Sequence, residues 1–345
     1  MRYVGVDLHK KTSVICVVEL VGNARKVVCR KRFFNDQTKE IYDFFVTLGE
    51  FQVVVEATAS YEWFLQLVEA LADRVVLAHP KHLRIIAESK NKSDKIDSQV
   101  LAEFLALDMI PQAYRPGPRQ REHRALVRQR RYLQGRITSV KNKLRNILSN
   151  YNQDRAGLFS TEGRVHLANV RLSTSDRFVV NQLTAELEHH EVQLNAMDKQ
   201  LRQFANEAPI REQEAREVLD TVPCVGPVTI EVVISELGDV RRFDSLKEVA
   251  AYGGLAPGRR ESAGRARDLG ITKEGSRLLR WAMVELAWRL TSKTQRWHRI
   301  YHNLKARMGA KKAIVAVARR VLCVLASLLR SGQQYNKAME VHVKA

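Results

Sequence analysis

Apolar and polar positions in the opening third of the chain follow strand-like and helix-like periods in turn. Three segments rich in β-branched residues come first, at residues 2–8, 13–20 and 26–33. Short polar turns separate them, and this pattern predicts a three-strand antiparallel meander. Helix-like and strand-like segments then alternate, at about 38–48, 52–56, 61–72, 74–78 and from 81 onward. Because helical crossovers join the later strands, the order predicts an α/β fold with an RNase H-like sheet.

Heptad spacing dominates the middle of the chain. Apolar residues keep a/d spacing, with one polar interruption at Gln129 or Arg130, at Leu126, Leu133, Ile137, Val140, Leu144, Ile147 and Tyr151. The spacing returns at Leu183, Leu187, His190, Leu194, Met197, Leu201 and Phe204. A polar segment at about 152–174 joins the two patterns, which therefore predict either an antiparallel hairpin or a dimerisation arm. An ordinary packed helix with a solvated charged face is the alternative for the first pattern.

The last third is predicted to be helical with one glycine-rich interruption. An apolar helix, a tight turn at Val225-Gly226 and a second helix opened by Pro227 resemble a helix-hairpin-helix. Backbone N–H groups at such a turn can bind a phosphate. A loop follows from Gly253 to Gly275, then helices at about 276–293 and 310–331.

Charge identifies the expected partner. The chain has 57 Lys and Arg against 38 Asp and Glu, a net charge of +19 over 345 residues, so a polyanion such as nucleic acid is expected. No uncharged stretch is long enough to span a membrane, and the first residues lack a signal-peptide core, so we expect a soluble, intracellular chain. The dispersed Cys16, Cys29, Cys224 and Cys323 form no C-x-x-C pair, which favours buried thiols over a zinc site.

The segment from Arg119 to Arg145 contains ten basic residues and only one acid, Glu122. We therefore predict that this segment, through residues such as Arg128, Arg131 and Lys141, binds a nucleic-acid backbone without reading bases.

Four acidic residues are candidate metal ligands. Asp7 and Glu56 each end an apolar strand, while Asp94 and Asp97 lie three residues apart on one helical face. Taken singly, a strand-end acid more often caps a helix or faces solvent. Together, four carboxylates need a divalent cation to stay ionised at close range, and all-oxygen ligands favour Mg²⁺, with Mn²⁺ as a substitute.

Ser262 is a candidate nucleophile. It lies between Arg259-Arg260 and Arg265 and Arg267, cations that can neutralise a phosphodiester under attack. From the residues alone, an ordinary loop hydroxyl among phosphate-binding arginines is the favoured interpretation, because no His-Asp relay is nearby.

Motifs along nearly the whole chain resemble one known family. They are GVDLHK, VVEATAS, SDKIDSQVLAE, VPCVGPVTI, AAYGGLAPGRRESAG and GITKEGSRLLRWAMVELA. In order and spacing the chain resembles the DEDD insertion-sequence transposases of the IS-one-ten (IS110) family, bridge-RNA-guided serine recombinases related to the Piv DNA invertases. The resemblance implies that Asp7, Glu56, Asp94 and Asp97 are the DEDD tetrad and that Ser262 becomes covalently joined to DNA. Many members have Ser-Ser-Gly where this chain has Ser262-Ala263-Gly264.

Further implications of the resemblance are an active site shared between domains, a homo-oligomeric synaptic complex (dimer or tetramer), a structured non-coding RNA partner, and action at the nucleoid of a bacterial or archaeal cytoplasm. The predicted domains are a RuvC-like domain at 1–112, a basic coiled-coil arm at 113–210 and an all-α transposase domain at 211–345 that carries the serine loop. We predict an RNA-guided DNA recombinase. The alternatives are a RuvC-like nuclease or junction resolvase that uses water, and a non-catalytic nucleic-acid-binding scaffold.

Overall fold

The computed structural model describes the chain except residues 23, 58–59, 87–93, 263–264 and 336–345. Contacts divide it into two compact units, Met1–Arg115 and Pro116–Ala345. The three-domain division expected from the sequence stays a prediction.

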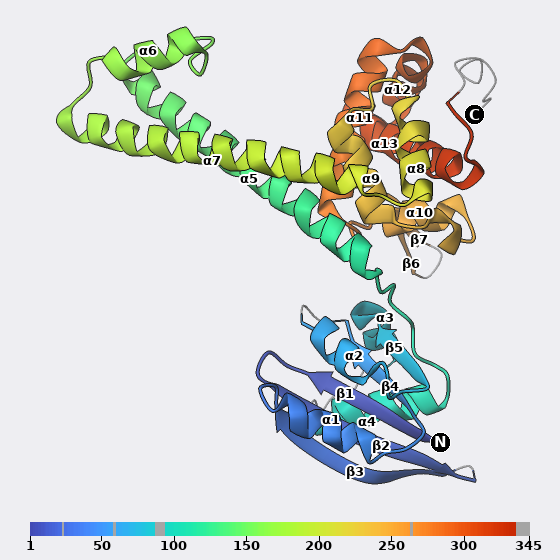
Figure 1. The fold of residues 1–345 in the computed structure, drawn as a ribbon. Coiled ribbons are helices and arrows are strands. Elements are labelled where there is room, and N and C mark those ends of the chain that lie inside the picture. Colours follow the sequence, from blue (N-terminus) through green and yellow to red (C-terminus); the bar gives the residue numbers. More distant parts are fainter. Residues whose placement is uncertain (23, 58–59, 87–93, 263–264, 336–345) are drawn as a thin grey trace. The chain divides into compact units, whose positions relative to one another are not determined.

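The N-terminal unit is built on a five-stranded mixed sheet (Figure 1). Its strands are β1 (Arg2–Leu8), β2 (Thr12–Val21), β3 (Ala24–Phe34), β4 (Phe51–Glu56) and β5 (Arg74–Ala78), in the order β3-β2-β1-β4-β5. The first three strands pair antiparallel, whereas β1, β4 and β5 pair parallel. This confirms the predicted meander followed by helical crossovers.

Helices cover both faces of this sheet. They are α1 (Thr38–Val46), α2 (Glu62–Val68), α3 (Pro80–Ile86) and α4 (Asp94–Ala106). Successive residues of a strand point to opposite faces, so Val4 and Val6 of β1 pack with Phe45 of α1 and Phe64 of α2. On the other face, Val54 of β4 packs in a cluster with Leu101 and Leu105 of α4.

The second unit is mostly helical, as predicted. Its helices are α5 (Pro118–Asn150), α6 (Thr161–Asn169), α7 (Thr174–Asn206), α8 (Ile210–Asp220), α9 (Pro227–Leu237), a 3-10 turn η1 (Val240–Arg242), α10 (Leu246–Tyr252), α11 (Arg277–Lys293), α12 (Gln295–Met308) and α13 (Ala310–Ser331). Helices α8 to α13 enclose one large apolar core that includes Val233, Met283 and Val317. The two helices predicted on either side of the Val225-Gly226 turn are present as α8 and α9, with Pro227 opening α9.

Helices α5 and α7 pack side by side as an antiparallel pair within one chain (Figure 1). Arg119, near the start of α5, reaches Phe204 at the end of α7, and Arg136 pairs with Glu186. Of the two arrangements left open by the sequence, the chain by itself forms the hairpin. We call α5, α6 and α7 the arm.

The seam of the arm follows the predicted heptads with small shifts. Leu133, Ile137, Val140 and Leu144 of α5 are buried as expected. Towards the end of α5 Leu148 is fully buried where Ile147 had been expected, because the straight helical period drifts from a strict heptad. The polar interruption is Arg130, which the packing accommodates by an ion pair with Asp198 of α7 at 2.6 Å.

One prediction for this unit is wrong. The segment Gly253–Gly275, expected as a loop in an all-α domain, contains a two-stranded antiparallel hairpin of β6 (Pro257–Ser262) and β7 (Arg265–Ile271). Glycine and arginine concealed the strands in the sequence, because neither gives the β-branched alternation that marks a strand. Within the described part of the chain, no helix combines the length and apolar character needed to cross a membrane.

Candidate functional site

Asp7 and Glu56 lie at the ends of neighbouring parallel strands. Val6 of β1 stands opposite Val55 of β4, so the next residue on each strand is one of the two acids. Because Val4, Val6 and Leu8 pack on the α1 and α2 side, Asp7 belongs to the opposite face, which α4 covers. Its side chain is only 15% exposed, and His9 Nε2 lies 3.1 Å from Asp7 Oδ2.

Helix α4 crosses the same face at very short range. A Cβ added to Gly5 would lie 2.0 Å from the Ser98 carbonyl oxygen and 2.5 Å from the Ala102 nitrogen, so only glycine permits this approach. Tyr3 packs further along α4, in the cluster of Leu101 and Leu105. The helix therefore runs antiparallel to β1, and its first turns lie towards the strand end that carries Asp7.

These first turns contain the second pair of acids. Asp97 directly precedes Ser98, and Asp94 begins the helix one turn earlier. The backbone thus brings the starting segment of α4 to the sheet edge where Asp7 and Glu56 lie. The side chain of Asp94 lies outside the described residues, and the side chains that are described include no group of three His, Cys, Asp or Glu residues able to hold a metal.

The chemical type of the acidic side chains at this edge suits a hard divalent cation. Asp7, Glu56 and Asp97 offer carboxylate oxygens, the ligands that Mg²⁺ and Mn²⁺ take, and the glycine contact at Gly5 sets the backbone of α4 against β1.

Sequence reasoning missed a histidine at the same edge. Glu56 stands opposite Ala78, the last residue of β5, and His79 follows directly. The rings of His79 and His82 stack with centroids 4.4 Å apart. The only available signal was the strand-end position, the feature that singled out Asp7 and Glu56.

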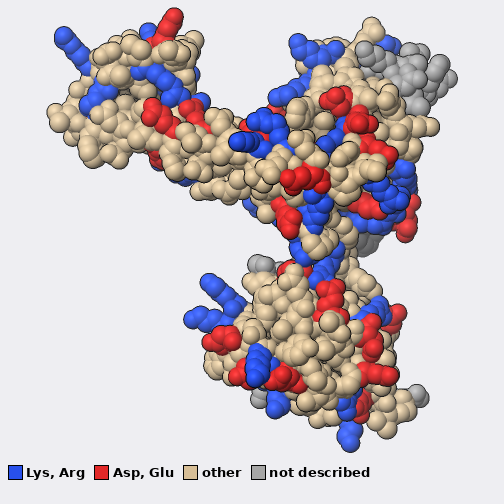
Figure 2. Space-filling model, viewed as in Figure 1, with Lys and Arg blue, Asp and Glu red and all other residues tan. Residues whose placement is uncertain are grey.

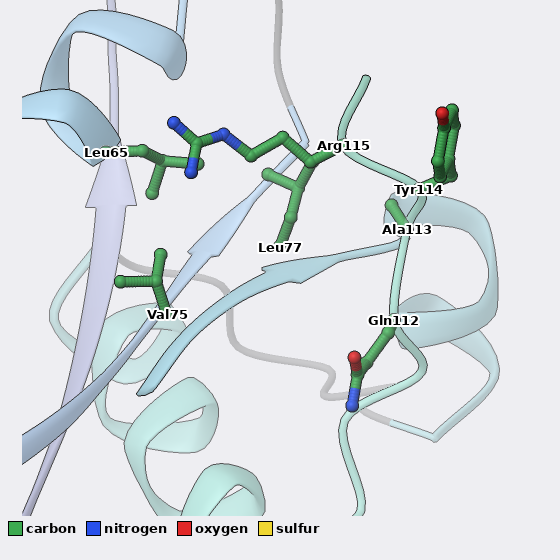
Figure 3. Close-up of a pocket in the computed structure, with 7 residues that line it drawn as sticks. All are labelled: Leu65, Val75, Leu77, Gln112, Ala113, Tyr114 and Arg115. Atoms are coloured by element: carbon green, nitrogen blue, oxygen red, sulfur yellow. The ribbon is translucent and has the colours of Figure 1, made fainter. Parts of the chain in front are cut away.

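A separate cavity lies on the other face of the sheet. It measures about 410 Å³ and is lined by Leu65, Val75, Leu77, Gln112, Ala113, Tyr114 and Arg115 (Figure 3). Hydrogen bonds from Arg115 to Glu62, and then to Glu69, raise the pKa of the Arg115 guanidinium. Val75 and Leu77 pack on the α1 and α2 side, so this cavity is not part of the carboxylate edge.

Ser262 is the last residue of β6, beside the hairpin tip. The strand register sets Ser262 opposite Arg265 and Arg260 opposite Arg267, while Arg259 stands opposite Asp268. By strand alternation, the positions of Ser262, Arg260, Arg265 and Arg267 share one face of the ribbon. The side chains of these residues lie outside the described part of the structure.

The base of the hairpin is held by backbone contacts and one arginine. Arg280 of α11 donates from Nη1 to the Gly275 carbonyl at 2.6 Å and to the Gly253 carbonyl at 3.4 Å. A Cβ on Gly275 would lie 1.8 Å from the Tyr252 carbonyl oxygen, so this position needs glycine. Burial, and then the nearby Arg277, lower the pKa of Arg280. The strand bearing Ser262 therefore starts from a closely packed base.

Acidic and basic side chains lie close together along the arm (Figure 2). Acids of the same unit pair with most of the basic residues of the segment predicted to bind nucleic acid. The ion pairs are Arg119 with Glu212, Arg128 with Glu236, Arg130 with Asp198, Arg136 with Glu186, Lys141 with Glu191, and Arg145 with Asp154. Counting charges in the sequence segment alone missed these partners, because all of them come from outside it.

Arg128, Lys141 and Arg131 have different surroundings. Hydrogen bonds to the buried Glu236 raise the pKa of Arg128, and Lys141 is 3.1 Å from Glu191. Arg131 instead lies over the ring of Trp281 at 4.1 Å.

Known transposases resemble this chain along most of its length. Residues 4–153 match a family model described as a transposase, and residues 216–302 match the model of the transposase IS116/IS110/IS902 family. Over 344 residues the chain is 24% identical to the transposase for insertion sequence element IS1111A of Coxiella burnetii, covering 97% of this chain and 91% of that one.

Two further relatives extend the comparison. A transposase for insertion sequence element IS1328 of Yersinia enterocolitica is 24% identical over 291 residues, with 82% of each chain covered. The pilin gene-inverting protein of Moraxella bovis is 22% identical over 343 residues, covering 97% of this chain and 98% of the relative. The two family matches and the full-length relatives agree: the chain is similar to insertion-sequence transposases of the IS110/IS116 family along most of its length, and it is a DNA-processing enzyme of the transposase class.

Proposed function

We propose that this transposase is an RNA-guided DNA recombinase that cuts and exchanges strands through a phosphoserine intermediate at Ser262. In this proposal Asp7, Glu56, Asp94 and Asp97 hold Mg²⁺, for which Mn²⁺ can substitute. The observation that carries the metal site is the adjacency of the β1 and β4 ends, together with the close contact between Gly5 and α4.

The role of the carboxylates in this proposal is to bind the divalent cation and to orient the phosphate that reacts. A divalent cation bound there would offset the negative charge that develops on a phosphate during transfer. Asp7 is mostly buried and has His9 at 3.1 Å, so its position is constrained before any substrate binds. Four carboxylates in so basic a chain are otherwise hard to explain at one sheet edge.

Ser262 exchanges one phosphodiester bond for another. Its oxygen forms a bond to phosphorus while the bond from phosphorus to one deoxyribose oxygen breaks. The serine proton is lost, and the departing oxygen gains a proton. The arginine positions 260, 265 and 267 share the ribbon face of Ser262, where guanidinium groups would neutralise the phosphate. Because the number of phosphorus–oxygen bonds is conserved, the reverse step can join the protein-bound end to a new strand.

Rejoining is what favours a recombinase over a nuclease. The Moraxella relative is named for gene inversion, and inverting a DNA segment requires that cut ends be joined again. The RNA partner, a dimeric or tetrameric assembly and action on cytoplasmic DNA rest on the family resemblance and the net charge of +19.

The variant Ser262→Ala tests the proposal, because it removes one oxygen and no charge. We expect it to bind DNA normally and to lose both strand exchange and the protein–DNA adduct on a denaturing gel. Ser331→Ala, at the end of α13, is the matched control and should keep both. Cleavage by Ser262→Ala at the normal rate would rule out the serine mechanism and favour the water-using nuclease. Nucleic-acid binding that needs neither Ser262 nor metal, with no cleavage by the parent protein, would favour the non-catalytic scaffold.

A further inference from the structure

Two tryptophans of α11 lie on the surface of the second unit. Trp281 is 36% exposed and Trp288 is 46% exposed. They are seven residues apart, so they lie on one helical face two turns from each other. An aromatic side chain that stays exposed to solvent does not gain the free energy of burial. Exposed apolar surface of this kind commonly marks a binding site.

The core does not need these two rings. The opposite face of α11 already fills the core with Leu279, Met283, Leu286 and Leu290, none of which is more than 2% exposed. The neighbouring Trp297 of α12 shows the ordinary arrangement, because it is 2% exposed. Trp281 and Trp288 are therefore additions to a helix whose packing is complete without them.

One arginine of the arm contacts a tryptophan ring, and two arginines of α11 are near the tryptophans in the sequence of the helix. The guanidinium of Arg131 lies over the Trp281 ring at 4.1 Å, although the two residues are far apart in the sequence. Arg277 and Arg289 of α11 are exposed. Among the described residues, Arg131, Arg277 and Arg289 form no ion pair, in contrast to the paired arginines along the arm.

Trp288 is backed by a second aromatic ring. Its centroid is 5.6 Å from that of Tyr301 of α12, in an edge-on arrangement that fixes the Trp288 ring. The exposed acid on this face of α11 is Glu285, between the two tryptophans. A phosphate would avoid Glu285, whereas its carboxylate can accept a hydrogen bond from a base amino group.

Stacking rings flanked by unneutralised arginines match the chemistry of an unpaired nucleic-acid strand. A duplex hides the faces of its bases, so it offers arginines its phosphates but offers the rings nothing to stack on. A second copy of this chain is disfavoured as the occupant because each copy has a net charge of +19. DNA is the nucleic acid that a transposase processes, and DNA strands must come apart before they can be exchanged.

We propose that Arg131, Trp281, Trp288 and Arg289 form a docking surface for single-stranded DNA, in which bases stack on the two tryptophans and the arginines contact phosphates. This surface goes beyond the chemistry of Ser262 and does not depend on it.

The test measures binding of an oligodeoxythymidine of about 16 nucleotides, the upper site size of a single-strand-binding module. Without divalent metal, and in the Ser262→Ala background, no cleavage chemistry contributes to the signal. We expect Trp288→Ala and Trp281→Ala each to weaken binding by about fivefold or more, since one stacked base is lost. Trp288→Phe should retain most of the affinity. Tyr42→Ala, at an exposed aromatic of α1, is the control and should bind normally.

Intrinsic fluorescence gives a second readout that a structural role would not move. The chain has four tryptophans, of which Trp297 is buried, so stacked bases should quench chiefly Trp281 and Trp288. The quenching should be smaller in Trp288→Phe, whose thermal unfolding should match that of the parent. Equal losses for the single strand and a duplex of the same length would overturn the proposal. So would a loss confined to an RNA oligonucleotide, or a change of sedimentation without a change in binding, which would indicate an interface between copies.

Discussion

Gly5 of β1 and Ser98 of α4 are in such close contact that a single methyl group does not fit between them. A Cβ on Gly5 would lie 2.0 Å from the Ser98 carbonyl oxygen. This contact sets the height of α4 above the sheet, and with it the distance from Asp94 and Asp97 to the strand ends of Asp7 and Glu56. One small residue in a strand therefore controls how closely two pairs of acids approach.

We expect Gly5→Ala to destabilise the N-terminal unit by about 1–3 kcal/mol or more, because overpacking forces α4 away from β1. The transposase activity of Gly5→Ala should decrease, and so should the response of that activity to added metal. The measurement is thermal unfolding followed by circular dichroism. Gly135→Ala is the control: it lies on α5 with nothing within 4 Å of the added Cβ, and should stabilise by about 0.5–1 kcal/mol. Equal stability for Gly5→Ala and the parent would contradict the tight contact.

Asp94→Ala should abolish recombination while leaving the fold intact. Loss of a metal ligand removes transition-state charge stabilisation of several kcal/mol, which corresponds to about a hundredfold or more in rate. Asp43→Asn, at an exposed acid of α1, should be fully active. EDTA should stop the parent enzyme, and added Mg²⁺ or Mn²⁺ should restore it. Full activity of Asp94→Ala, or of the parent in EDTA, would eliminate the metal site.

Ile137→Asp should unfold the arm, because Ile137 is 4% exposed in the seam between α5 and α7 and a carboxylate there has no partner. Thr138→Asp, at the adjacent exposed position, should leave the helical signal and the melting temperature close to those of the parent.

Light scattering on the same variants, and on Leu194→Asp, examines assembly. If the arm also packs between subunits, Ile137→Asp and Leu194→Asp should each weaken the oligomer, because each puts a charge into the heptad seam. An unchanged particle mass for both variants would argue against the arm as an assembly element.

Stability should depend on pH through Glu231 of α9. Burial raises the pKa of Glu231, but His123, with Nε2 at 2.6 Å, and Arg216 lower it by more, so the pKa is below its ordinary value of 4.5. A lowered folded pKa gives stability that is present above the unfolded pKa of 4.5 and is lost as the pH falls further. As the pH is lowered from 4.5, the unfolding temperature should therefore decrease more steeply in the parent than in Glu231→Gln. Parallel curves for the two proteins would contradict this.

Local pattern was sufficient for the strands of the five-stranded sheet and for the arm helices, and it singled out the acids at the strand ends. β-branched alternation placed the strands, and the acids at their ends were visible because Asp7 and Glu56 interrupt apolar runs. The helix α1 links β3 to β4, and β3 runs in the same direction as β1, so the parallel pairing of β1 with β4 and their neighbouring strand ends follow. Heptad spacing likewise predicted the two arm helices, because side chains three and four residues apart share one face whatever lies elsewhere.

Only the tertiary structure decided which distant groups meet. The sequence shows ten basic residues in one segment, but the acids that pair with Arg128, Arg130 and Lys141 come from later helices. The sequence also places Arg131 and Trp281 far apart, and folding stacks one on the other. The hairpin that ends at Ser262 was hidden because its glycines and arginines have weak strand preference, and pairing between β6 and β7 supplies what their local preference lacks. Composition and period are properties of neighbouring residues, whereas ion pairs, stacking and strand pairing depend on contacts that only the folded chain makes.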